Sequence, residues 1–228
     1  MTERDISNVM LDVPHWFDVE GQHFAFFPPT LGKVRINAQL MEDIGVSAEY
    51  NGIIEDLRLI SKHRKEVCTL IAYNTFDKKE EVLNYPLVSE RADFFMKHLK
   101  DKDIALLFQL LVQFVVINKI PEYIKFLGID EDKQLMQRVQ RAKKNNNTYV
   151  FGGKTLYGAL IGSAIEKYHW TYDYVLWGIS FINLQMLLAD AITSIYLTDE
   201  ERKGLPSPSY KKVKVTKENI SELAKRFQ

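Results

Sequence analysis

The feature that most constrains this chain is an apolar segment over residues 175–197, which is long enough to cross a bilayer. A membrane span would place Asn183, Gln185 and Asp190 near its middle. One Asp at that depth costs about 3 kcal/mol on insertion scales, so we predict a core helix of a soluble domain instead. Apolar residues recur in the segment at helical spacing: Trp177, Phe181, Leu184, Leu188, Ile192 and Ile195. The neighbouring positions are also apolar, which predicts a central helix buried nearly all round.

A second apolar run, over residues 104–117, falls short of the roughly 20 residues that a bilayer demands. We therefore predict a second core helix there and expect no membrane association. The chain has 228 residues, which suffice for one sizeable core.

The charge balance and the cysteine count narrow the class of protein. Lysine plus arginine and aspartate plus glutamate each number 30, so the formal net charge is zero. A nucleic-acid-binding protein normally needs a basic excess to contact phosphates, so that class is disfavoured. Cys68 is the only cysteine, which fits a reducing cytoplasm. Residues 1–5 lack the basic start of a signal peptide, so we expect a cytoplasmic protein.

The N-terminal quarter reads as a hairpin that leads into a helix. We predict a loose, flexible arm over residues 1–14 and a hairpin over residues 15–29, with Glu20 and Gly21 in its turn. Thr30 is a candidate N-cap for a helix that Gly45 closes.

The rest of the chain is predicted to be helical. An amphipathic helix is expected over about 49–73, with Arg64 marking the solvent-exposed end of its apolar face. Further helices are expected over 89–99, 104–118, a short stretch after Pro121, 130–144, 156–168, 175–197 and a last turn after Thr198. The sequence thus predicts a mainly α protein: a helical domain over 15–203 that includes the N-terminal β-hairpin, a linker over 204–215, and a C-terminal amphipathic helix over 216–228.

Sequence motifs typical of catalytic, phosphate-binding or metal-binding sites are weak in this chain. Gly153-Lys154-Thr155 matches the end of a phosphate-binding loop, but the earlier glycine that such a loop needs would stand at Thr148. The five histidines make no pair at metal-binding spacing. A Ser–His–Asp site could still be assembled from separate helices, although no nucleophile-elbow pattern supports it. We therefore expect no catalytic residue, no cofactor and no metal.

Polar residues on one face of the segment 175–197 allow two interpretations. These residues are Ser180, Asn183, Asp190 and Ser194. In the first interpretation they fix the register of a packed helix by hydrogen bonds. In the second they form the polar rim of a groove that accepts a partner helix. We favour the first, because buried polar groups usually have hydrogen-bond partners within the protein.

Small and aromatic residues follow a distinctive order in two stretches. The C-terminal one reads Phe151-Gly152-Gly153-Lys154-Thr155-Leu156-Tyr157-Gly158, then Trp170-Thr171-Tyr172-Asp173-Tyr174-Val175-Leu176-Trp177-Gly178-Ile179-Ser180, then Asn183-Leu184-Gln185-Met186 and Ala189-Asp190. The N-terminal one reads Gly21-Gln22-His23-Phe24 and Pro29-Thr30-Leu31-Gly32-Lys33. Both stretches, within residues 149–202 and 17–45, resemble the tail assembly chaperones of tailed bacteriophages and prophages.

This resemblance implies a non-enzymatic helper in the cytoplasm of the bacterial host. Such chaperones bind and solubilise the tape measure protein, help to recruit tail tube protein, and are not expected in the mature virion. A homo-oligomer is a further candidate assembly. The residues expected to bind a partner are Trp170, Tyr174, Trp177, Phe181, Met186, Asp190, Leu223 and Phe227. The alternatives are a structural component retained in a phage tail or related injection particle, and an enzyme whose site is dispersed over the helices.

Overall fold

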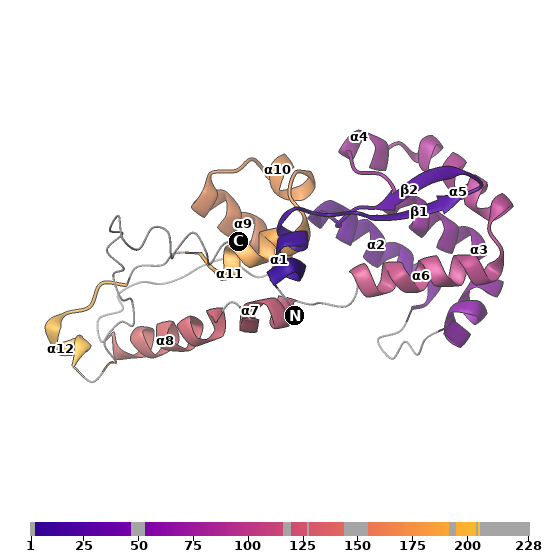
Figure 1. Ribbon diagram of the computed structural model, residues 1–228. Helices are drawn as coiled ribbons and strands as arrows, with labels where there is room; N and C mark the ends of the chain where they lie inside the picture. The colour runs from indigo at the N-terminus through magenta and orange to yellow at the C-terminus, as the bar shows by residue number, and fades with distance from the viewer. Residues whose placement is uncertain are drawn as a thin grey trace, which may run out of the picture. The chain divides into compact units, whose positions relative to one another are not determined.

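The computed structural model describes residues 3–46, 53–115, 120–126, 128–143, 155–191, 195–203 and 205. These residues form twelve helices and one two-stranded antiparallel sheet near the N-terminus, so the prediction of a mainly α fold with a small hairpin is confirmed (Figure 1). They belong to two compact units, Met1–Lys133 with Thr148–Thr193, and Gln134–Asn147 with Ser194–Gln228. No helix within the described ranges is long and apolar enough to span a membrane.

The predicted hairpin is confirmed, and aromatic side chains anchor it. Strand β1 (His15–Val19) pairs with β2 (Gln22–Phe26), with Phe17 opposite Phe24. Glu20 and Gly21 both have positive φ, 49° and 74°, as a two-residue turn that matches the strand twist requires. On the inner face, the ring of Phe24 meets Phe95 of helix α5 (Tyr85–His98) edge to face, at 4.9 Å between centroids.

Helix α2 (Leu31–Ile44) begins and ends where the sequence predicts. The Thr30 side chain accepts a hydrogen bond from the Lys33 N–H, and Gly45 adopts the left-handed conformation with φ 81°. The hydroxyl satisfies a donor of the first helical turn that has no partner within the helix.

The larger core gathers β1, β2, α2, α3 (Ile53–Asn74), α4 (Lys79–Val82), α5 and α6 (Asp101–Val115) (Figure 1). Helix α3 kinks at His63, with φ −129° and ψ 37°. The expectation that Arg64 marks the solvent-exposed end of the apolar face of this helix is wrong. The Arg64 side chain donates to the carbonyls of Met96 and Leu99 and forms an ion pair with Asp101. It thereby ties α3 to the end of α5 and the start of α6.

Several helix boundaries differ from the predictions. Helix α5 begins at Tyr85, a turn before the expected start at residue 89, because Asn84 caps it and its first turn tolerates Pro86. Helix α6 is buried along one face only, and Leu106 on its other face is 56% exposed. Helices α7 (Ile120–Phe126) and α8 (Ile129–Ala142) lie close to their predicted ranges.

The prediction of one helix over residues 175–197 is wrong. Helix α10 (Tyr172–Trp177) ends before Gly178, and helix α11 (Phe181–Ala189) begins after Ser180. The chain breaks there because Ser180 caps α11 by accepting from the Asn183 N–H, while the Phe181 N–H donates to the Pro29 carbonyl at 2.8 Å. Residues 195–198 are not helical.

The N-terminal segment also differs from the expected loose arm, because residues 3–10 form helix α1 (Glu3–Met10). The side-chain amide of Asn183 donates to the Val9 carbonyl at 3.1 Å and to Asp12 Oδ1 at 3.0 Å. These bonds tie the end of α1 to α11, a contact between residues more than 170 positions apart that the local sequence does not reveal.

The described residues of the second unit include the C-terminal part of α8 and helix α12 (Asp199–Arg202). Thr198 and Glu201 form a capping box at the start of α12, as the prediction of a last short turn requires. Of the predicted linker over 204–215 only Leu205 is described, and the predicted helix over 216–228 lies outside the described residues.

Candidate functional site

A second, smaller core holds the C-terminal helices of the first unit together. It consists of Leu31, Ala164, Val175, Ile179 and Leu184, all buried. These residues come from the start of α2, from α9 (Leu156–Tyr168), and from α10, α11 and the break between them. Of the expected partner-binding residues, Trp170 and Phe181 pack against this core and are partly buried.

Three aromatic rings meet where α9 turns into α10, and we call Tyr168, Trp170 and Tyr174 the aromatic corner. The Tyr168 and Trp170 rings stack with centroids 4.7 Å apart, and the Trp170 and Tyr174 rings meet edge to face at 5.1 Å. The turn is set by His169, whose φ of 55° ends α9, and by Thr171, which caps α10 through the Tyr174 N–H.

The corner is held rigidly on its inner side and stays accessible on the other. The Tyr168 hydroxyl donates to the Leu187 carbonyl at 2.7 Å, and burial, followed by the nearby Asp190 charge, raises the pKa of that hydroxyl. A Cβ at Gly178 would lie 2.3 Å from Tyr174 Cδ2, so only glycine lets this ring pack there. Tyr174 remains 44% exposed.

Aliphatic side chains extend this surface. Leu187 is 41% exposed, and its carbonyl is the one that Tyr168 binds; Ile165, one helical turn before Tyr168, is 39% exposed. Partly exposed aromatic and aliphatic groups on a rigid support are typical of surfaces that bind an apolar partner.

Trp177 does not belong to the aromatic corner. Its ring packs against the larger core and covers α2 at Gly32, where a Cβ would lie 2.7 Å from the ring atoms. The side chain is partly buried and so acts in joining α10 to α2. The remaining expected residues are scattered: Met186 is partly buried on α11, Asp190 is exposed at its C-terminal end, and Leu223 and Phe227 lie outside the described residues.

Two of the four polar residues that the sequence places on one face of residues 175–197 are hydrogen-bonded within the chain, in agreement with the favoured interpretation, whereas Asp190 is exposed. Ser180 is buried as the cap of α11, and Asn183 holds the end of α1. Ser194 lies outside the described residues.

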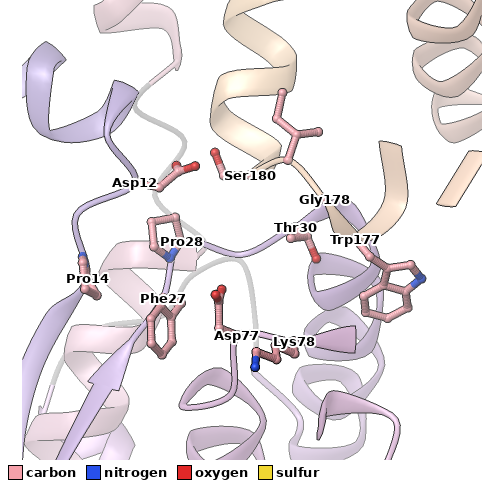
Figure 2. Close-up of a pocket in the computed structure, with 11 residues that line it drawn as sticks. Asp12, Pro14, Phe27, Pro28, Thr30, Asp77, Lys78, Trp177, Gly178 and Ser180 are labelled. Carbon is pink, nitrogen blue, oxygen red and sulfur yellow. The ribbon is translucent and has the colours of Figure 1, made fainter. Parts of the chain in front are cut away.

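A cavity of about 420 Å³ opens beside the break between α10 and α11 (Figure 2). Its lining comes from the loop between α1 and β1, the loop between β2 and α2, the loop after α3, and the break itself: Asp12, Pro14, Phe27, Pro28, Thr30, Asp77, Lys78, Trp177, Gly178, Ile179 and Ser180. These segments are far apart in the sequence, so no motif could have predicted the cavity.

The polar groups of the cavity lie at the junction of these segments. Burial raises the pKa of the Asp12 carboxyl, hydrogen bonds from Ser180 and Asn183 oppose that rise, and the nearby Asp77 charge adds to it. Figure 2 shows the Asp12 and Ser180 side chains close together, consistent with their hydrogen bond. The lining contains no histidine or cysteine, and no cluster of metal-binding side chains occurs among the described residues. The arrangement can bind a small polar group through its carboxylates and hydroxyls.

No family model, curated protein or solved structure matches this chain. The functional proposal therefore depends on the sequence resemblance and on the geometry described above.

Lys33 ends the N-terminal stretch that carries the resemblance, but the sequence does not indicate that this residue is buried. The residue is 2% exposed, and its ammonium donates to the Phe76 carbonyl at 2.8 Å. Burial lowers the pKa of Lys33 to about 8, and the Asp77 charge partly opposes this effect. One turn further along α2, Asn37 and Asn74 exchange two amide hydrogen bonds of 3.0 and 2.9 Å. Lys33 and Asn37 of α2 are therefore bound to the end of α3 and to the loop that follows it.

Proposed function

We propose that the protein is a tail assembly chaperone that binds and solubilises the phage tape measure protein and helps to recruit tail tube protein. The observation that best supports this proposal is that the two stretches carrying the resemblance form one packed unit. Trp177 covers Gly32, the Phe181 N–H bonds the Pro29 carbonyl, and Thr30 pairs with Ser180 in an isolated bridge. The shared residues of the motif are thus structural partners of one another.

The aromatic corner with Ile165 and Leu187 is the surface that we propose for the tape measure protein. A long helical protein exposes apolar faces before it assembles, and an apolar surface that is already folded can cover them with little loss of conformational entropy. The chaperone would act in the cytoplasm of the bacterial host and leave before the particle is complete.

Co-expression with the tape measure protein tests this proposal. Wild-type chain should keep that protein soluble, whereas Leu187→Glu should not, because the carboxylate would have to be desolvated against an apolar helix. Leu83→Glu is the matched control, since Leu83 is 56% exposed at the end of α4 and lies outside the proposed surface. Equal solubility of the tape measure protein with both variants, or without the chain, would contradict the proposal.

The structural alternative is a component that stays in the tail or in a related injection particle. Mass spectrometry of purified particles separates the two functions. Stoichiometric amounts of the chain in mature particles favour the retained component, and its loss during assembly favours the chaperone.

A further inference from the structure

Backbone groups at the outer edge of β1 have no hydrogen-bond partner among the described residues. In a hairpin with a two-residue turn, the residues next to the turn form a hydrogen-bonded pair, and bonded and non-bonded pairs then alternate. Val19 and Phe17 therefore bond β2, while the N–H and C=O groups of Trp16 and Asp18 point away from it. The sheet has two strands within the described residues, and no hydrogen bond joins these outward groups to any described residue.

The side chains at this edge are also exposed. Trp16 is 69% exposed, and the Asp18 side chain is 66% exposed in an ion pair with His23 on β2. An open strand edge is a template for another strand, and a tryptophan this exposed is rare outside interfaces. The edge is short, because the next outward position is Pro14, which has no N–H to donate.

We propose that two copies of the chain associate by pairing β1 with β1 of the second copy in antiparallel orientation. With the two-fold axis at Phe17, Trp16 lies opposite Asp18 of the second copy. This register uses each outward N–H and C=O of both residues once, so four backbone hydrogen bonds form and the two hairpins become a four-stranded sheet.

Charge and sheet size favour a second copy as the occupant. The formal net charge of the chain is zero, so two copies do not repel each other as a whole. Each Asp18 keeps its own His23 as a counter-ion across the sheet. The pairing would extend the small two-stranded sheet to four strands, a commoner sheet size in folded proteins. This inference does not depend on the proposed function.

Sedimentation velocity of the full chain over a wide concentration range tests the pairing. Wild type should form a dimer that dissociates on dilution. Asp18→Pro removes an outward N–H and leaves the bonds to β2 in place, so it should be monomeric. His23→Pro is the matched control: it removes an outward N–H from β2 and breaks the same Asp18–His23 ion pair, so it should still dimerise.

Two further measurements keep the test decisive if a proline variant fails to fold. Trp16→Glu alters only an exposed side chain, places a carboxylate opposite Asp18 of the second copy, and should weaken dimerisation about tenfold, because like charges directly opposite each other destabilise a strand pair. Amide exchange of Trp16 and Asp18 should slow as the wild-type concentration rises. A wild type that is monomeric throughout, or a dimer that Asp18→Pro and His23→Pro affect equally, would overturn the proposal.

Discussion

A close contact between Gly32 and Trp177 predicts that one substitution will have opposite effects in two backgrounds. Gly32 is the second residue of α2 and has an ordinary helical backbone, so Gly32→Ala should on propensity alone stabilise the protein by up to about 1 kcal/mol, the value for a helix interior. The new Cβ, however, would lie 2.7 Å from the Trp177 ring, closer than real Cβ contacts occur. Overpacking of this kind typically costs about 1–3 kcal/mol.

We therefore expect Gly32→Ala to destabilise the wild type by up to about 2 kcal/mol, the overpacking cost less the gain in helix propensity. Trp177→Ala alone should cost about 2–3 kcal/mol, less than a fully buried tryptophan, because the ring is partly exposed. In the Trp177→Ala background the clash is gone, and Gly32→Ala should then stabilise the protein by up to about 1 kcal/mol.

Urea unfolding of the four proteins in this double-mutant cycle measures the coupling between the two positions. The change of sign is the informative result, because it requires the ring to lie over Gly32. If Gly32→Ala stabilised both backgrounds equally, α10 would not pack on α2. The claim that the two stretches carrying the resemblance pack against each other would then be wrong.

Two further predictions concern buried titratable groups. The pKa of Lys33 is lowered to about 8 from 10.5, so the unfolded chain binds more protons between these pH values, and stability should rise with pH across that window. The difference in unfolding free energy between wild type and Lys33→Met should change by about 3 kcal/mol from pH 8 to 10.5, and a flat difference would refute burial of the ammonium. Cys68 on α3 is fully buried, and this burial raises the pKa of its thiol to about 11. A thiol reagent at pH 8 should therefore label the native protein far more slowly than the unfolded chain. Equal labelling rates would show that α3 is open to solvent at this position.

Local signals in the sequence were sufficient where the structure depends on neighbouring residues. The hairpin follows from alternating aromatic residues around Glu20 and Gly21, and both ends of α2 follow from Thr30 and Gly45. In each case the residue that determines the geometry is within a few positions of the element that it controls.

The sequence failed where a distant segment determines the outcome. Apolar periodicity favours one helix over residues 175–197, but the hydrogen bond from Phe181 to the Pro29 carbonyl and the cap at Ser180 divide it. Helix α1 depends in the same way on Asn183, which lies more than 170 residues further along the chain. Tertiary hydrogen bonds here override the local preference.

The candidate site was predicted in part. Trp170 and Tyr174 do form one surface, because both lie at the turn between α9 and α10. Trp177 is on the same short helix as Tyr174 but packs on α2, and helical spacing alone could not separate these roles. The cavity beside Ser180 was not predicted, since its lining comes from four separate segments.

Hydrogen exchange of the chain with and without its tape measure protein tests the central claim most directly. We expect amides around the aromatic corner, from Ile165 to Tyr174, and those near Leu187 to become protected in the complex, while the hairpin and α5 exchange as before. Unchanged exchange at the corner, with a partner bound elsewhere or not at all, would contradict the account.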